Sequence, residues 1–202
     1  MSSSCTMAAF LGVADVPAAL GRAEVALRDV GLVDGDHDPE AVLAWRDGVV
    51  LRPGQAALGA TVYGQQLLDL KTNGVAFRGG PYFNAYAVGF AAYFECPSCG
   101  QRVTEDQDAY GDQMSAVGMA AAAWCDGDRG ASAACQLCGV ASVVTEWGLS
   151  DPVFLADMAV EFWNWPYLDP DPAARAQWWR VDVVGLLEQA VGGEARLSGY
   201  KV

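Results

Sequence analysis

Two short cysteine motifs constrain this 202-residue chain more than any other feature. The motifs are Cys96–Gly100, reading C-P-S-C-G, and Cys135–Gly139, reading C-Q-L-C-G. The spacing lets both sulfurs of one tight turn point at the same ion, and the closing glycine is expected to let the backbone fold close beneath it. Four thiolates arranged tetrahedrally suit Zn²⁺. The sequence therefore predicts one structural Zn²⁺ with four ligands, Cys96, Cys99, Cys135 and Cys138.

The same four cysteines are open to two other interpretations. A rubredoxin-like single iron uses an identical donor set, and C-x-x-C pairs also serve redox or disulfide chemistry. Catalytic zinc is disfavoured, because a site of four cysteines leaves no open coordination position. The two remaining cysteines receive no role: Cys125 is expected in the core, and Cys5 in a mobile terminus.

A long acidic insert separates the two motifs. Its 35 residues include a stretch from 103 to 128 with six Asp or Glu and no Lys or Arg. Asp112 is expected to cap a helix. Apolar residues at three- and four-residue spacings mark its buried face, namely Met114, Val117, Ala121 and Trp124. Metal binding on the zinc-finger scale contributes about 10–16 kcal/mol, so the metal-free protein is expected to be partly unfolded.

Charge and composition narrow the class of protein. Twenty-five acidic and twelve basic side chains give a formal charge of −13, which repels phosphate backbones and anionic lipid surfaces. A hydrophobic content of 52% supplies a folded core. The start of the chain lacks the pattern of a secretory signal, and no apolar run approaches membrane-spanning length. We therefore expect a cytoplasmic protein that binds neither nucleic acid nor membrane. Few lysines among its basic residues indicate a bacterial source.

The remaining sequence predicts an α+β fold, with a mainly antiparallel sheet, a few packed helices and an embedded zinc-ribbon-like four-cysteine site. Helices are expected at 17–30, behind an Asp15 cap, at 64–70, and from an Asp182 cap to 191. Strands are expected at 75–77, 82–94, 140–147, 156–165 and 195–200. We expect a single domain over 1–202, with the zinc-ribbon subregion at about 90–148 and a helical insert between its knuckles.

One predicted strand, 156–165, offers a candidate interaction surface. Alternation assigns one face to the core, with Met158, Val160 and Phe162. The other face carries a carboxylate and two tryptophans, Glu161, Trp163 and Trp165. Aromatic residues of this kind are enriched in interaction hot spots. The alternative is that the C-terminal helix, or Trp178 and Trp179, covers this face.

Enzyme signatures are missing from the sequence. No G-x-S-x-G, G-x-G-x-x-G or H-E-x-x-H motif occurs, and His37 is the single histidine. His37 lies in the polar turn 34–40, which reads as a solvated loop. The turn imitates the start of a calcium loop, but Pro39 replaces the required glycine and Trp45 replaces the closing glutamate, so an EF-hand is rejected. Weak binding of a divalent cation stays open.

Several segments together resemble a group of uncharacterised bacterial zinc-ribbon proteins of the actinobacterial type. The segments are Thr72–Val75, the two C-x-x-C-G motifs, the F-W-N-W-P run Phe162–Pro166, and the tail Val183–Val202. The resemblance covers about residues 60–202 and implies zinc and a bacterial source. It implies no mechanism.

These observations predict a non-catalytic zinc-binding protein that acts through protein–protein contact, as an immunity-type inhibitor or an adaptor. Its acidic surface suits a basic protein partner. One rival is a zinc ribbon associated with nucleic acid, which would need more basic residues near the knuckles than Arg102 and Arg129. The other is a thiol redox or hydrolytic enzyme, which would need a pocket with converging polar groups.

Overall fold

The computed structural model describes residues 4–43, 48–83, 91–150 and 153–201. Its helices and mainly antiparallel sheet confirm the predicted α+β class. Contacts divide the chain into two compact units: unit 1, which comprises Met1–Gly80 and Asp157–Val202, and unit 2, which comprises Pro81–Ala156. Folding of residues 1–202 as a single domain stays a prediction. None of the described helices is long and apolar enough to cross a membrane.

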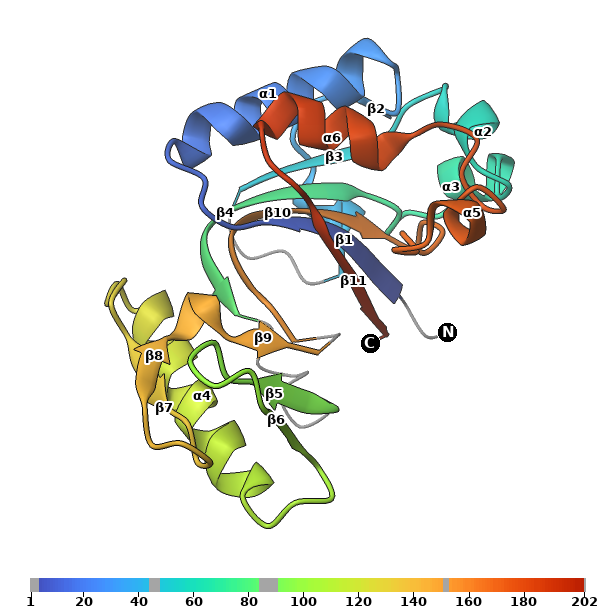
Figure 1. Ribbon diagram of the computed structural model, residues 1–202. Helices are drawn as coiled ribbons and strands as arrows, with labels where there is room; N and C mark the ends of the chain where they lie inside the picture. Colours follow the sequence, from blue (N-terminus) through green and yellow to red (C-terminus); the bar gives the residue numbers. More distant parts are fainter. Residues whose placement is uncertain (1–3, 44–47, 84–90, 151–152, 202) are drawn as a thin grey trace. The chain divides into compact units, whose positions relative to one another are not determined.

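A six-stranded sheet in the order β11-β1-β10-β4-β3-β2 forms the base of unit 1 (Figure 1). The strands are β1 (Ser4–Phe10), β2 (Val33–Asp34), β3 (Val49–Pro53), β4 (Val75–Phe83), β10 (Leu155–Trp163) and β11 (Arg196–Lys201). The β1–β10, β1–β11, β2–β3 and β3–β4 pairs are antiparallel. The strands expected near 75–77, 156–165 and 195–200 are therefore confirmed.

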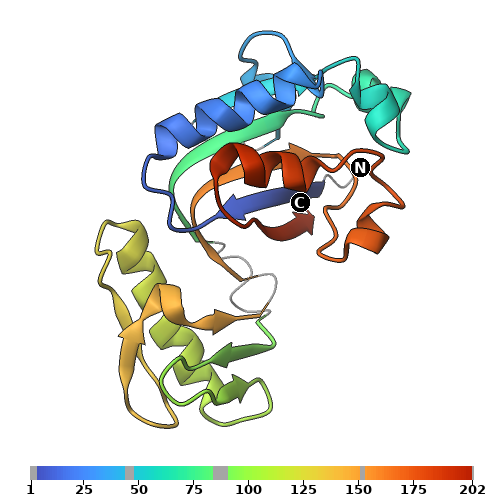
Figure 2. The ribbon, with the colours of Figure 1, turned by 45° about the horizontal axis from the view of Figure 1, so that its top comes forward.

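Two helices, α1 (Val16–Asp29) and α6 (Val183–Val191), lie side by side over one face of this sheet (Figure 2). Their predicted caps are confirmed, because Asp15 accepts a hydrogen bond from the Ala18 amide and Asp182 accepts one from the Gly185 amide. Shorter elements complete the unit: η1 (Pro39–Ala41), α2 (Ala57–Ala60), α3 (Gln65–Asp69) and α5 (Pro172–Arg175).

The main core of unit 1 fills the space between the sheet and these helices. The predicted inward face of β10, with Met158, Val160 and Phe162, belongs to this core. It packs there with apolar residues that include Phe10, Leu27, Phe77 and Leu187. Removal of this apolar surface from water is the main stabilising contribution to unit 1.

The N-terminal segment was predicted to be a mobile terminus, but in the structure it is a paired strand. Ser4–Phe10 is the strand β1, which pairs with β10 on one side and β11 on the other. Cys5, expected in that terminus, is only 2% exposed. The segment lacks polar alternation because both of its faces are buried, and a strand buried on both faces does not alternate. This is why the alternation pattern missed it.

The second face of the sheet carries a buried ion pair. Arg78 Nε lies 2.7 Å from Glu161 Oε1, at an angle that makes an ion pair rather than an aligned hydrogen bond. Trp163 Nε1 donates to the other carboxylate oxygen, Glu161 Oε2, at 3.0 Å. Glu161 and Trp163 are 1% and 0% exposed. These side chains are part of the interior.

Trp165 does not share a face with Trp163, because the alternation ends at Asn164. Asn164 has φ of 60°, which turns the chain after β10. Trp165 then stacks on Trp179 with ring centroids 5.6 Å apart, and both belong to the core that contains Phe162. The prediction of a partner-binding surface at Glu161, Trp163 and Trp165 is therefore wrong: all three are buried, and Trp179 covers Trp165.

Unit 2 combines small sheets with one long helix. The strands β5 (Tyr93–Glu95), β6 (Arg102–Thr104) and β9 (Gly148–Leu149) form one sheet, and β7 (Ser132–Ala134) pairs with β8 (Ala141–Val143). The predicted strand 140–147 is wrong beyond Val143, where the 3-10 helix η3 (Val144–Glu146) follows. Of the predicted strand 82–94, residues 84–90 lie outside the described part of the chain.

The predicted insert helix is confirmed as α4 (Tyr110–Cys125), although its start is not where the cap was expected. The residue at the N-cap position is Ala109, and Asp112 lies inside the first turn. A carboxylate in the first turn still interacts favourably with the positive end of the helix dipole. This explains why an acidic residue marks the start of the helix without capping it.

The buried ion pair makes unit 1 sensitive to the loss of either charge. Arg78→Met leaves the Glu161 carboxylate buried without its cation, so we expect a loss of about 3–5 kcal/mol in the free energy of unfolding, measured with urea. The double variant Arg78→Met/Glu161→Leu is expected to recover most of this loss, because it removes both charges of the pair. Equal instability of the single and double variants would contradict the pairing.

Candidate metal centre

Four cysteine sulfurs converge at one point in unit 2. The Sγ atoms of Cys96, Cys99, Cys135 and Cys138 all lie within 4.8 Å of one another, and Cys96 Sγ is 4.0 Å from Cys138 Sγ. A tetrahedral ion with Zn–S bonds of about 2.3 Å separates its sulfurs by about 3.8 Å. A disulfide would require about 2.05 Å. The observed separation therefore fits a metal ion bound between two pairs of thiolates.

Each pair sits at the tip of a hairpin, and the two tips have the same backbone hydrogen bonds. Cys96–Gly100 joins β5 to β6, and Cys135–Gly139 joins β7 to β8 (Figure 1). In the first tip the Gly100 amide donates to the Cys96 carbonyl at 2.8 Å. In the second the Gly139 amide donates to the Cys135 carbonyl at the same distance. Two copies of one local structure thus supply all four sulfurs.

The closing glycines are required for their backbone conformation. Gly100 and Gly139 have φ of 66° and 74°, in the left-handed region that favours glycine. A Cβ at either position would meet no atom of the structure within 4 Å. Close contact with the surrounding protein therefore does not explain why these positions are glycine. The left-handed backbone conformation explains it.

Gln113 of α4 holds the second tip in place, and the sequence analysis did not find it. Its Oε1 accepts a hydrogen bond from the Gln136 amide at 2.9 Å, and its Nε2 donates to the Ala134 carbonyl at 3.2 Å. Both partners flank Cys135, and Gln113 is fully buried. The amide therefore fixes the peptide units on either side of a ligand.

A sequence signal for Gln113 did exist. It lies four residues before Val117, on the buried face of α4, whereas the predicted stripe began at Met114, which is only half-buried. A polar side chain in register with an apolar stripe needs a buried partner. That requirement, rather than the spacing of apolar residues, identifies it.

Further hydrogen bonds connect the two tips and reach a sulfur. Ser98 Oγ lies 2.8 Å from Ser142 Oγ, which links the first tip to β8. The Leu137 amide donates to Cys135 Sγ at 3.4 Å, and such bonds stabilise a thiolate. Support around the ligands is characteristic of sites that hold a metal in a defined geometry.

The metal-free thiols titrate very differently. For Cys96, burial raises the pKa, but hydrogen bonds from the Cys99 and Ser98 amides and to neighbouring sulfurs outweigh it, so the pKa is lowered to about 7. For Cys99, the Gln101 amide lowers the pKa, but burial and the other three sulfurs raise it to about 11. Of these two thiols, Cys96 is therefore the more readily ionised, and Cys99 must lose its proton when a metal binds.

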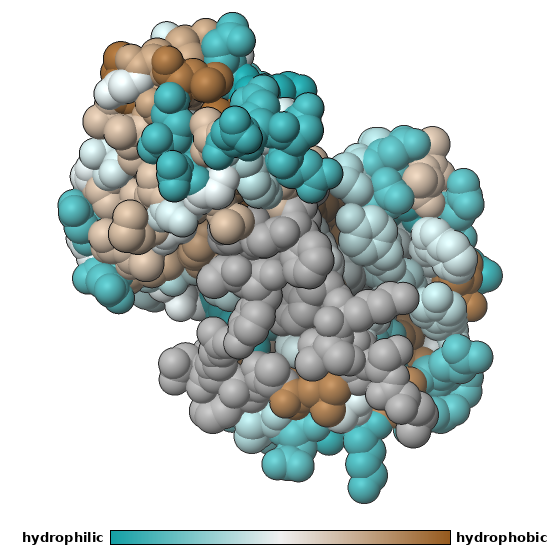
Figure 3. All heavy atoms as spheres, turned by 90° about the horizontal axis from the view of Figure 1, so that it is seen from below, coloured by the Kyte–Doolittle hydropathy of each residue, from teal (hydrophilic) through white to brown (hydrophobic). Residues whose placement is uncertain are grey.

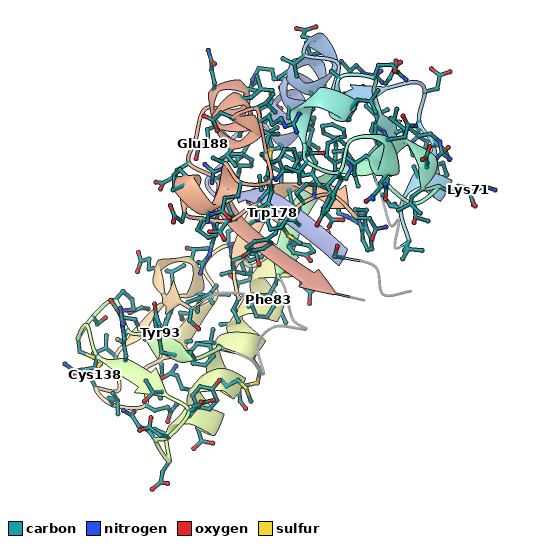
Figure 4. The ribbon with its side chains drawn as sticks, turned by 90° about the vertical axis from the view of Figure 1, so that its right-hand side faces the viewer. Lys71, Phe83, Tyr93, Cys138, Trp178 and Glu188 are labelled. Carbon is teal, nitrogen blue, oxygen red and sulfur yellow. The ribbon has the colours of Figure 1, made fainter. Side chains whose placement is uncertain are left out.

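The donor set contains sulfur alone. Among the described residues, no histidine or carboxylate joins the cluster. Cys96 and Cys135 are buried, Cys99 is half-buried, and Cys138 is exposed at the periphery of unit 2 (Figure 4). Four soft ligands close the coordination shell of a tetrahedral ion, which is the pattern of structural rather than catalytic metal sites.

The other candidate residues do not belong to this cluster. Cys125 packs half-buried against the core of unit 2, and burial raises the pKa of its thiol. Cys5 lies in β1 of unit 1. His37 Nδ1 accepts a hydrogen bond from the Val50 amide at 3.0 Å, so the imidazole holds its loop against β3.

Comparisons with known proteins add no identity. No family model matches the sequence, and neither the search of curated proteins nor that of solved structures gave a match.

Loss of the Gln113 amide is expected to weaken metal binding without removing a ligand. Gln113→Leu removes the hydrogen bonds to the Ala134 carbonyl and from the Gln136 amide, which hold the peptide units on either side of Cys135, so the zinc affinity should fall about 10–100-fold. Competition with a chromophoric chelator measures this. The control is Gln107→Leu, at an exposed position, which should bind zinc as wild type does. Equal affinities of all three proteins would contradict a supporting role for Gln113.

Zinc affinity is expected to fall as the pH falls, because protons and metal compete for the same sulfurs. The Cys99 thiol, with its pKa of about 11, is protonated near neutrality, so the metal must displace its proton. That competition alone weakens zinc binding about tenfold for each unit by which the pH falls. Below about pH 7 the Cys96 thiol also takes up a proton, and the dependence should steepen. Chelator competition between about pH 8 and pH 6 tests this, and an affinity independent of pH would contradict thiolate ligation.

Proposed function

We propose that the four-cysteine cluster holds a structural Zn²⁺ and that the protein acts through contact with another protein rather than by catalysis. The observation that carries the zinc proposal is the convergence of four sulfurs from two matching hairpin tips. Zn²⁺ suits such a site because its filled d-shell imposes no competing geometry. The resemblance to bacterial zinc-ribbon proteins agrees with this choice of metal.

The metal is proposed to stabilise unit 2. The core of unit 2 is small, and the sheets in it have strands of only two or three residues. Short strands and a 35-residue insert leave much chain entropy to offset. Binding on the zinc-finger scale of about 10–16 kcal/mol supplies a stabilisation of the required size.

A basic protein partner is favoured by the charge of unit 2. Residues 81–156 contain nine Asp or Glu and two Arg, a formal charge of −7. The acidic side chains around α4 are exposed: Glu105, Asp106, Asp108, Asp112, Asp126 and Asp128. Such a surface steers a positively charged partner toward it.

Both arginines of unit 2 already have partners within the unit. Arg102 Nε lies 2.6 Å from Glu95 Oε2, and the Arg102 guanidinium lies over the Tyr93 ring. The Arg129 guanidinium lies over Trp124. Binding to phosphates needs several available cations, so this distribution disfavours the nucleic-acid alternative. An immunity-type inhibitor or an adaptor of a basic protein is the role that we propose.

Removal of the metal tests the structural role. The purified protein is expected to contain one zinc per chain by elemental analysis, and Cys138→Ser to retain zinc less tightly. Chelation should abolish the near-ultraviolet dichroism of the buried Trp124 and Trp147 in unit 2. Readdition of Zn²⁺ should restore it. Unchanged dichroism after complete removal of the metal would contradict a structural role, and iron in place of zinc would contradict the choice of metal.

Charge reversal tests the partner. A basic protein that the zinc-loaded chain captures should bind the wild-type chain again once it is purified. Its affinity for the Asp108→Lys/Asp112→Lys variant should be about tenfold lower, and this loss should be larger at low salt than at high salt. The matched control, Asp36→Lys/Glu40→Lys, reverses two exposed acids of unit 1 and should bind normally. Equal losses in both variants would contradict docking on unit 2. Retention of nucleic acid instead of protein would overturn the partner class.

A further inference from the structure

Unit 1 contains a hollow of about 660 Å³, which we call the β1–α3 pocket. It is independent of the metal centre, since all of its lining belongs to unit 1. Its walls come from the start of β1, from α3 and the turn before it, from the chain after β10, and from Gly199 of β11. The volume lies within the range of about 300–1,000 Å³ that small-molecule sites occupy.

The floor of the pocket presents apolar surface, because its polar atoms are bonded into the protein. Thr6 Oγ1 donates to the Ser198 carbonyl at 3.3 Å and accepts from the Leu168 amide at 2.9 Å. Trp165 Nε1 donates to the Asn73 carbonyl at 3.3 Å. A molecule in the pocket therefore meets the hydrocarbon parts of these side chains.

Asn164 holds one wall in a defined position. Its φ of 60° is the left-handed conformation, and no other non-glycine residue in the described part of the chain has a positive φ. Its side chain accepts from the Ser4 amide at 3.0 Å and donates to the Thr72 carbonyl at 3.0 Å. Sparsely populated backbone conformations persist only where surrounding contacts enforce them. The wall is thus preorganised, and a ligand need not order it.

The rim exposes apolar and aromatic side chains. Tyr63, Leu70 and Tyr167 are 40%, 47% and 47% exposed. Trp178, labelled in Figure 4, does not line the pocket, but it is 42% exposed and its ring centroid lies 6.2 Å from that of Tyr63. Figure 3 shows one face of the molecule, on which hydrophobic and hydrophilic residues are interspersed. Contiguous apolar groups around a hollow mark binding sites more often than scattered ones do.

Charged side chains are absent from the twelve lining residues, although the whole chain carries −13. A charged ligand would lose hydration in the pocket without gaining an opposite charge. Gln66 brings an exposed carboxamide to the rim, which both donates and accepts hydrogen bonds. The lining therefore selects for a neutral molecule.

We propose that the β1–α3 pocket binds an uncharged, ring-containing small organic molecule. The apolar body of the ligand lies on the floor formed by Leu67 and Trp165, between Tyr63 and Tyr167, and Gln66 meets a polar atom at the rim. The proposal also accounts for three residues of the F-W-N-W-P run, Asn164, Trp165 and Pro166, which line this pocket.

A matched pair of fluorescent probes tests the proposal. N-phenyl-1-naphthylamine is neutral and brightens in apolar surroundings, and 1-anilinonaphthalene-8-sulfonate is the same aromatic framework with one negative charge. The zinc-loaded protein is expected to bind one molecule of the neutral probe with micromolar affinity. It should bind the sulfonate at least about tenfold more weakly, because a desolvated anion finds no counter-charge.

A matched pair of variants locates the site. Leu70→Glu places a carboxylate at the rim and should lower the affinity for the neutral probe at least about tenfold. Leu11→Glu makes the same change at a leucine that is 46% exposed and does not line the pocket, and should leave binding within about twofold. Urea unfolding of both variants checks that each is folded, and Gln66→Trp, which fills the rim without adding charge, serves in place of Leu70→Glu if that variant does not fold.

The proposal is overturned if the neutral probe does not bind, if the sulfonate binds equally well, or if the Leu11 and Leu70 variants bind alike. Loss of zinc from unit 2 does not enter these readouts, so failure here leaves the structural metal site untouched.

Discussion

The meeting of four sulfur atoms is the constraint on which unit 2 depends. Two hairpin tips that are far apart in the sequence must come within 4.8 Å, and short strands alone give little reason for them to do so. The second tip is held from the side by Gln113, and the first tip is linked to β8 through Ser98 and Ser142. A bound ion would tie both tips to one point, which allows the intervening chain to be long, since closure entropy grows only slowly with length.

Unit 1 depends instead on burial of the central strands on both faces. β1 and β10 meet a helix-covered core on one side and the Arg78–Glu161 pair with Trp163 on the other. Burial of a carboxylate is tolerable because a guanidinium and an indole N–H satisfy it. The two tryptophans that suggested an interaction surface, Trp163 and Trp165, are thus buried in the interior of unit 1.

Three chemical environments therefore coexist in one acidic chain. The exterior around α4 is negatively charged, the metal centre is a set of thiols, and the β1–α3 pocket is neutral and aromatic. Electrostatic attraction at the exterior acts over about a Debye length, whereas binding in the pocket depends on contact. A protein partner and a small molecule would thus engage this protein through different forces.

Features encoded within a few residues were determined by the sequence itself: the two C-x-x-C-G tips with their left-handed glycines, the caps at Asp15 and Asp182, and the inward face of β10. Tertiary structure alone decided that Cys5 lies in a central strand opposite Trp163, that Glu161 is paired, that Gln113 supports Cys135, and that a pocket follows Asn164. The physical reason is range. Caps and tight turns are short-range interactions, but β1 and β10 pair across most of the chain, and two-sided burial removes the alternation by which a strand is recognised.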